Sequence, residues 1–165
     1  MKGIVFNLLE EVVGREYGEE TWDLLLERAG LEGTYTSLGN YPDEELRKLV
    51  SAASAALNRP MNEVIHWFGR SVLPILARKF PGFVAPHHST RSFLLTLNEV
   101  IHPEVQKLYP NAQVPVFDYE SPSEDVLLMG YRSSRGLCTF GEGLIEGAAA
   151  YFGERFTSSA VLAKG

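Results

Sequence analysis

The chain has 165 residues, of which 45% are hydrophobic and 11% aromatic, so it is long and apolar enough to form one globular domain with its own core. Its 15 basic and 21 acidic residues give a net charge of −6, which disfavours nucleic acid and anionic membrane surfaces as main partners. The single cysteine, Cys138, excludes a disulfide within the chain, and no apolar run reaches membrane-spanning length, so we expect a cytoplasmic protein.

The N-terminal part of the chain is predicted to be helical. Apolar residues recur at helical spacing in three segments, at residues 2–17, 21–29 and 44–57. The first two helices are expected to end at Gly18 and Gly30, and Asp43 is expected to cap the third. The N-terminal segment has acidic residues close behind its apolar ones and no small-residue cleavage site, so it is interpreted as an amphipathic helix and not as a signal peptide.

Three further helices are expected in the middle of the chain, at residues 61–80, 91–100 and 103–109. Pro60 marks the start of the first of these, and Pro74 inside it is expected to kink it. Residues 81–90 are predicted to form a loop, in which Ser89 or Thr90 caps the following helix.

The pattern changes after Pro110. Residues 113–121 and 125–134 are short and β-rich, and the segment ESPSED between them predicts a hairpin. Residues 137–156 return to a helical period. The predicted fold class is therefore α+β in one domain spanning residues 1–165. It has an α-rich N-terminal subdomain (approximately 1–60) and a C-terminal subdomain of helices plus an antiparallel sheet (61–165).

His102 lies among apolar residues and directly precedes Pro103. A proline lacks an N–H and is tolerated only near a helix start, which places His102 in or beside the first turn of the short helix. Considered alone, this histidine is more readily explained as a buried structural residue that donates to a backbone carbonyl than as a ligand.

Tyr131, Ser133 and Arg135 alternate onto one face if YRSSR forms part of a strand. They would then present two hydroxyls and a guanidinium, which together bind carboxylates, although an exposed polar strand face explains the alternation equally well. A ligand that carries two carboxylates and also takes an axial imidazole is haem.

The segment IHPEVQKLYPNAQVP followed by YRSSR resembles the haem-nitric oxide/oxygen binding domain, called H-NOX or HNOB. This is the sensor domain of soluble guanylate cyclase and of many bacterial signalling proteins. MKGIVFNLLEEVV, GEETWDLLLERAGL and GLIEGAAAYF resemble the same family, so the resemblance covers nearly the whole chain. It implies that haem b is held between the subdomains, that His102 is the proximal iron ligand, and that Tyr131, Ser133 and Arg135 bind the propionates. Pro115 falls where the family packs a proline against the porphyrin and distorts it.

The same resemblance predicts which gas is bound. Oxygen-binding members of the family place a tyrosine in the distal pocket, and this position aligns with Phe140, which has no donor. Leu9 and Val72 stand where some oxygen binders have supporting polar groups. The apolar lining is completed by Val5, Leu76 and Leu144, each of which is equally well explained as a plain core residue. We expect nitric oxide to bind the ferrous haem, with carbon monoxide as a second candidate and oxygen disfavoured.

The chain departs from some relatives in its C-terminal part. Bacterial members that bind structural zinc do so through cysteines and a histidine there, whereas here only Cys138 is available, so no zinc is expected. Members usually continue for another strand or two past the point matching Gly165, so either the given sequence is trimmed there or the sheet lacks an edge strand. His66 and the pair His87–His88 are expected to be structural or surface residues.

The expected output is a signal to another protein, since 165 residues leave no room for a second catalytic module. The resemblance suggests a histidine kinase, or an enzyme that makes or degrades a cyclic dinucleotide, and we expect no enzymatic activity in this chain. Two alternatives stay open. One is a peroxidase-like haem enzyme, against which the expected pocket lacks an acid–base pair. The other is a haem-free interaction module that binds a different carboxylate ligand.

Overall fold

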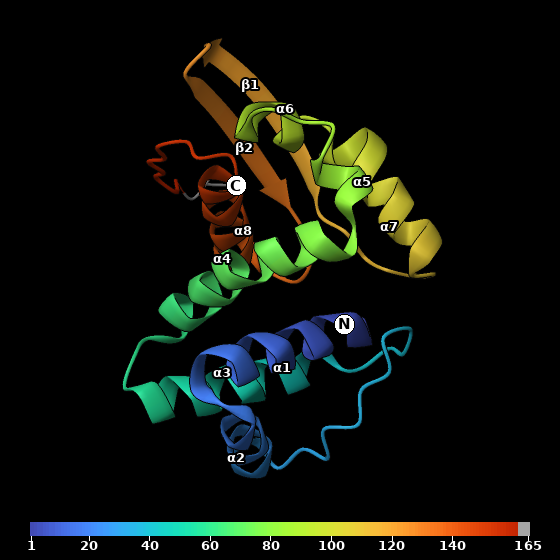
Figure 1. Ribbon diagram of the computed structural model, residues 1–165, viewed down its shortest axis with the longest axis vertical. Helices are drawn as coiled ribbons and strands as arrows, with labels where there is room; N and C mark the ends of the chain where they lie inside the picture. The colour runs from blue at the N-terminus through green and yellow to red at the C-terminus, as the bar shows by residue number, and fades with distance from the viewer. Residues whose placement is uncertain (162–165) are drawn as a thin grey trace.

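A computed structural model describes residues 1–161, which form eight α-helices, one π-helix and a two-stranded antiparallel sheet. This is the α+β fold that the sequence predicts (Figure 1). The elements are α1 (Gly3–Tyr17), α2 (Glu19–Ala29), α3 (Asp43–Leu57), α4 (Met61–Lys79), α5 (Pro81–Val84), α6 (Thr90–Leu94), η1 (Leu97–Ile101), α7 (His102–Leu108), β1 (Val116–Ser123), β2 (Val126–Arg132) and α8 (Cys138–Tyr151).

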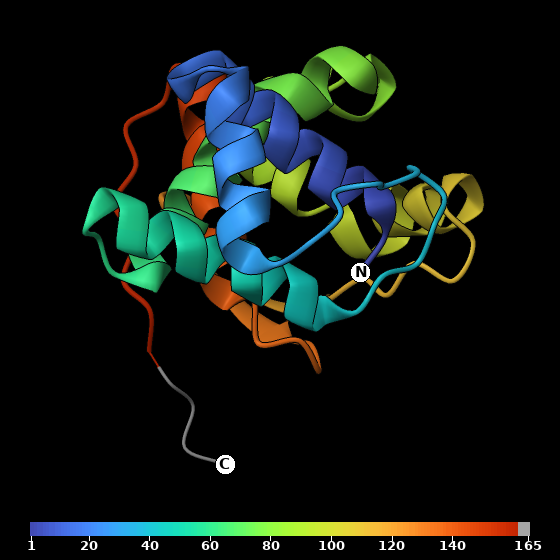
Figure 2. The same ribbon diagram turned by 90° about the horizontal axis from the view of Figure 1, so that it is seen from below.

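The N-terminal helices surround one hydrophobic cluster. Apolar faces of α1, α2 and α3 pack together with the inner face of α4, and Phe6, Val12 and Leu49 are almost fully buried there. Phe6 stacks on Tyr35 from the long loop before α3, with ring centroids 4.1 Å apart, which ties this loop to the core. Seen from below, these helices lie across the near side of the molecule (Figure 2).

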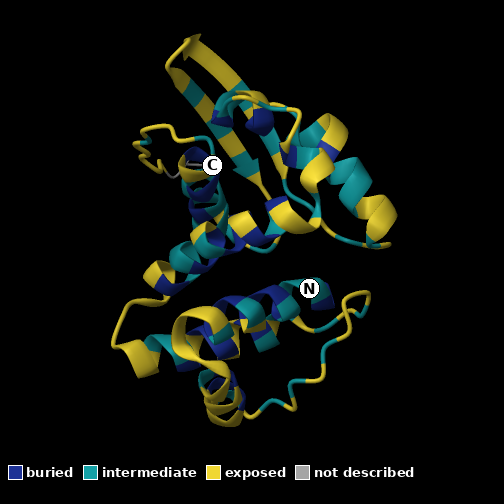
Figure 3. Ribbon diagram, viewed as in Figure 1, coloured by how far each residue is buried: buried dark blue, intermediate teal, exposed yellow. Residues whose placement is uncertain are grey.

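A second cluster lies between the end of α4, α6, the end of η1 and α8, and it buries Leu73, Phe93, Ile101 and Ala148. Helix α4 therefore contributes to both cores, and it continues without interruption through Pro74. The outer surface of the hairpin is mostly exposed, in contrast to the inner helix faces (Figure 3). Within residues 1–161, no helix is both long and apolar enough to cross a membrane.

Several expected boundaries are correct and others need correction. Gly30 ends α2 in the left-handed conformation, and the side chain of Ser89 caps α6 by accepting from the N–H of Ser92. The predicted cap Asp43 is instead the first residue of α3, and its carboxylate bonds to groups outside that helix. The predicted helix at 91–100 is wrong as a single element, because α6 stops at Leu94 and a π-helix follows.

In three other places the helix and strand boundaries differ from the predicted ones. The predicted loop at 81–90 contains the short helix α5. The expected six-residue hairpin connection is only a two-residue turn at Glu124 and Asp125, because β1 continues through an irregularity between Glu120 and Ser123. Helix α8 ends at Tyr151, five residues before the predicted end at Phe156.

Candidate functional site

His102 is the first residue of α7 and directly follows the π-helix η1. The N–H groups of Ile101 and His102 reach back five residues to the carbonyls of Thr96 and Leu97, which defines the π-turn. Pro103 contributes to this geometry, because it has no N–H to donate to the preceding turn. π-Turns inside helices are frequent at functional sites, so this local geometry favours a functional role for His102.

The surroundings of His102 favour the neutral form of its imidazole. Burial, the larger influence, lowers its pKa below the usual value, and the backbone carbonyl of Pro115 partly offsets this effect. Its Nδ1 is buried and has no hydrogen-bond partner among residues 1–161. A neutral imidazole with an unsatisfied buried nitrogen is chemically suited to a metal or to an external hydrogen-bonding partner.

Aromatic side chains connect His102 to the hairpin. The ring of Phe117 on β1 lies 6.0 Å from the imidazole, centroid to centroid, and 5.8 Å from the ring of Tyr131 on β2. Phe117 and Tyr131 are register partners across the hairpin. The structure therefore brings His102 and Tyr131 to the same side of the sheet, and the backbone of Pro115, just before β1, lies near His102.

The expected strand face of Tyr131, Ser133 and Arg135 is only partly present, and this prediction needs correction. Strand β2 ends at Arg132, so Tyr131 lies on the strand, whereas Ser133 and Arg135 lie in the turn that follows. The hydroxyl of Ser133 accepts a hydrogen bond from the N–H of Arg135 at 3.2 Å. The turn therefore brings Ser133 and Arg135 together by a local hydrogen bond and not by strand alternation.

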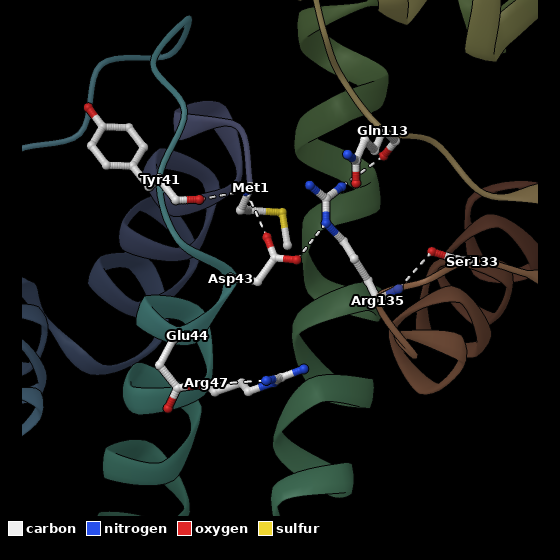
Figure 4. Close-up of polar contacts among 8 residues, drawn as sticks. All are labelled: Met1, Tyr41, Asp43, Glu44, Arg47, Gln113, Ser133 and Arg135. Carbon is white, nitrogen blue, oxygen red and sulfur yellow. Dashed lines mark hydrogen bonds and ion pairs between the residues drawn. The ribbon is translucent and has the colours of Figure 1, made fainter.

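The guanidinium of Arg135 reaches from this turn to two distant segments (Figure 4). Its Nε donates to the carboxylate of Asp43 at 2.9 Å, and its Nη1 donates to the carbonyl of Gln113, also at 2.9 Å. The other carboxylate oxygen of Asp43 accepts from the Met1 ammonium at 2.7 Å. Burial alone would raise the pKa of Asp43, but these cationic donors outweigh it and leave the pKa below its usual value.

The six residues predicted for the distal side lie in one apolar cluster. Leu9 and Val72 are buried in the N-terminal core, and the others pack against it while partly buried; these are Val5, Leu76, Phe140 and Leu144. The ring of Phe140 lies 5.1 Å from that of Phe68. A cavity next to this cluster is lined by apolar residues of α1, α3, α4 and α8, including Val5 and Phe140, and by the charged residues Asp43, Arg47 and Arg135. His102 and Tyr131 are not among its lining residues.

Three glycines set the position of Phe140 by bringing α4 and α8 into close contact. A Cβ at Gly143 would overlap the carbonyl oxygen of His66, and one at Gly69 would overlap that of Phe140. A Cβ at Gly147 would lie 2.8 Å from the carbonyl oxygen of Arg70. Only glycine permits this approach, which holds the start of α8 against the apolar cluster.

Other residues near the site were not predicted from the sequence. Four of them contact predicted site residues or their segments, but in the sequence they resemble a helix cap (Asp43), two strand residues (Gln113 and Phe117) and a helix residue (Asn98). His66 pairs with Glu146 at 3.1 Å, which agrees with the structural role expected for it. Within residues 1–161, His, Cys, Asp and Glu form no group of three that could hold a metal ion.

These residues fit a haem group by their chemistry. The half-buried imidazole of His102 has a buried Nδ1 without a partner among residues 1–161, which suits an iron ligand. The guanidinium of Arg135 already binds one carboxylate, and most residues that line the cavity beside it are apolar. The fold and this combination of residues are compatible with a haem-binding domain. The family model described as Haem-NO-binding (HNOB) matches residues 2–159, and the chain belongs to this family of haem-based gas sensors, the H-NOX domains.

Solved structures of bacterial H-NOX proteins have the same fold. One from S. oneidensis in the Fe(II)NO ligation state is 33% identical, with a TM-score of 0.86 over 93% of this chain and 86% of that one. The Fe(II)CO state of an H-NOX domain from the same organism, Shewanella oneidensis, is 33% identical, with a TM-score of 0.82 over 92% and 84%. The unliganded Fe(II) protein from K. algicida is 30% identical, with a TM-score of 0.82 over 93% and 84%.

Proposed function

We propose that this H-NOX domain is a nitric oxide sensor, that it binds ferrous haem b, and that His102 is the proximal iron ligand. One observation carries the assignment of His102: its buried Nδ1 has no hydrogen-bond partner among residues 1–161. In a structural histidine, a buried ring nitrogen normally has a hydrogen-bond partner. A ring nitrogen without such a partner is free to bind iron. When bound, haem would supply an iron centre that binds a diatomic gas.

Tyr131, Ser133 and Arg135 are proposed to hold the two propionates. The ion pair between Arg135 and Asp43 supports this role, because the guanidinium already holds a carboxylate at the polar side of the cavity. Tyr131 adds a phenol on the His102 side of the hairpin. Pro115, whose carbonyl influences His102, is proposed to pack against the porphyrin and distort it.

The apolar character of the distal side supports nitric oxide over oxygen. Phe140, Leu9 and Val72 offer no hydrogen-bond donor where a polarised dioxygen would need one. Nitric oxide depends far less on such a donor, because its affinity comes mostly from the iron. The similar proteins solved with nitric oxide and carbon monoxide support these two gases as ligands.

His102 is proposed to transmit the signal. His102 would hold the iron, and the start of α7, which carries it, can move because Pro103 removes a backbone hydrogen bond there. The recipient is proposed to be a histidine kinase or a cyclic-dinucleotide enzyme in the cytoplasm. The chain acts in this scheme as a sensor without catalysis of its own.

The visible spectrum of the haem-supplied protein tests this proposal. We expect a Soret band that shifts when nitric oxide is added to the ferrous form, and a chain that takes up no haem would instead support a haem-free module. The variant His102→Gly should lose haem unless imidazole is added, whereas the control His66→Gly should keep it. Retention of haem by His102→Gly without imidazole would contradict the ligand assignment, and rapid peroxide turnover would favour a peroxidase-like enzyme.

A further inference from the structure

The side chain of Asn98 bonds to both backbone groups of a single residue on β1. Its Nδ2 donates to the carbonyl of Phe117 at 2.6 Å, and its Oδ1 accepts from the N–H of Phe117 at 3.0 Å. The primary amide of asparagine offers one donor and one acceptor in the same arrangement as a peptide group. Asn98 therefore bonds to the N–H and the carbonyl of Phe117 as a residue of a neighbouring strand would.

These bonds lie on the edge of β1 that faces away from β2. Phe117 is the register partner of Tyr131, yet both of its backbone groups are used by Asn98, so this pair belongs to the class without mutual hydrogen bonds. An unpaired edge of a strand is a liability that a protein commonly covers. The segment from α6 to α7 lies on this side of the hairpin (Figure 1).

Two further side chains attach the same segment to the hairpin. The hydroxyl of Tyr119 donates to the carbonyl of Leu94 at 2.6 Å, and Arg91 donates to the carbonyls of Glu124 and Val126. The bonds of Tyr119 and Arg91 involve residues of α6, which precedes the π-turn in the chain. Asn98 lies within η1 itself, only four residues before His102. Of these three attachments, it is the one inside the element that leads directly into His102.

We propose that Asn98 is a positioning residue for His102. Its two bonds fix η1 against β1, and η1 passes directly into the first turn of α7, where the imidazole projects toward Phe117 and the backbone of Pro115. The side chain of Asn98 thus sets the distance and orientation of the imidazole relative to the surface formed by β1. This inference rests on the proposed role of His102 as the iron ligand.

Loss of these bonds should change the strain on the iron–histidine bond. With η1 released from β1, His102 can follow the iron or leave it more freely, so the ferrous iron–histidine stretching frequency should shift. The fraction of five-coordinate nitrosyl haem should shift with it. A residue that only stabilised the fold would move neither signal.

The test uses the haem-loaded protein with three variants. Asn98→Ala removes both bonds, whereas Asn98→Asp retains the acceptor for the Phe117 N–H but cannot donate to its carbonyl. Asn7→Ala is the matched control, because Asn7 also makes one donor and one acceptor bond with part of the long loop but lies in the N-terminal core region. Amide hydrogen exchange of Phe117, resonance Raman spectra and denaturant unfolding are measured for each variant.

For Asn98→Ala we expect exchange of the Phe117 amide to accelerate roughly tenfold and the iron–histidine frequency to shift. Asn98→Asp should shift the frequency while keeping more of the amide protection. If Asn98→Ala does not fold, Asn98→Asp alone provides the test. Asn7→Ala should lower stability without shifting the frequency. An unchanged frequency in both Asn98 variants would overturn the proposal.

The experiment separates this inference from the proposed function. If the wild-type chain binds no haem, or if its iron–histidine band survives in His102→Gly, the assignment of His102 fails, whatever the Asn98 variants do. If His102 is the ligand and the Asn98 variants leave its band in place, only the positioning role fails.

Discussion

The guanidinium of Arg135 and the carboxylate of Asp43 form an ion pair with a separation of 2.9 Å, across 92 residues of the chain. The pair joins the turn after β2 to the start of α3, and the Met1 ammonium bonds to the same carboxylate. It therefore connects the N-terminal helices with the part of the chain that carries His102. The pair also holds the cation that is proposed to meet a propionate.

In Asp43→Asn the free energy of unfolding should depend less on pH in the acid range than in the wild type. The pKa of Asp43 lies below its usual value, so its contribution is present above the ordinary carboxyl pKa of about 3.9 and is lost as the pH falls through the lower folded value. The variant should be less stable near pH 7, by about 1 kcal/mol or less because the side chain is 38% exposed and screened. Its free energy of unfolding should then fall less steeply below about pH 4.

Urea unfolding of the wild type and the variant at several pH values measures this effect. Asp118→Asn is the control, since Asp118 pairs with Arg132 on the exposed face of the hairpin, where both side chains are more than 60% exposed. Its acid dependence should match that of the wild type. Identical acid profiles for Asp43→Asn and the wild type would contradict the role of Asp43.

Phe140→Tyr should give the domain an oxygen complex. The ring of Phe140 packs in the apolar cluster, and a hydroxyl there would supply the missing donor to bound dioxygen. One hydrogen bond of about 1.4 kcal/mol corresponds to a complex that lasts roughly tenfold longer. Stopped-flow spectra of the ferrous protein mixed with oxygen measure its lifetime.

Phe83→Tyr serves as a control because Phe83 is also partly buried but packs against the other cluster. It should leave the oxygen reaction unchanged. A stable oxygen complex in the wild-type protein would show that the apolar distal side does not exclude this gas.

Gly143→Ala should be strongly destabilising and Gly141→Ala should not. A Cβ at Gly143 would overlap the His66 carbonyl of α4, so the two helices must separate, at a cost of about 1–3 kcal/mol. A Cβ at Gly141, in the same helix, meets nothing within 4 Å, and alanine there should add up to about 1 kcal/mol of stability.

Chemical denaturation of both variants measures the difference. The distal side should also change in Gly143→Ala, because displacement of α8 moves Phe140, and the spectrum of the nitric oxide complex reports this. Equal stabilities of the two variants would mean that α4 and α8 tolerate separation.

Tyr119→Phe should weaken the attachment between β1 and α6. Its hydroxyl donates to the Leu94 carbonyl, and burial raises the pKa of Tyr119 to about 12. We expect a loss of about 1 kcal/mol at neutral pH. Because the folded pKa is raised, this contribution is present below the ordinary pKa of about 10 and is lost as the pH rises toward 12.

The alkaline stability of Tyr119→Phe should therefore decline less than that of the wild type between about pH 10 and 12. Tyr151→Phe is the control, since Tyr151 is 50% exposed. A variant with wild-type stability throughout this range would show that the bond to Leu94 contributes nothing.

The sequence by itself determined the α+β class, most of the helices and the apolar character of the residues proposed for the distal side. Helical spacing and proline or glycine at the ends of segments act within a few residues, so they can be recognised in the linear chain. The family resemblance also came from the sequence, because the motifs around His102 and Arg135 are contiguous. The match of the family model over residues 2–159 confirms it.

Only the tertiary structure decided how the site is assembled. Asn98 was expected in a regular helix, and its bonds to Phe117 depend on a π-turn and on a strand 19 residues away. Arg135 was expected on a strand face, yet it lies in a turn and pairs with Asp43 from the other end of the chain. Contacts of this kind arise from packing between distant segments, and no local pattern encodes them.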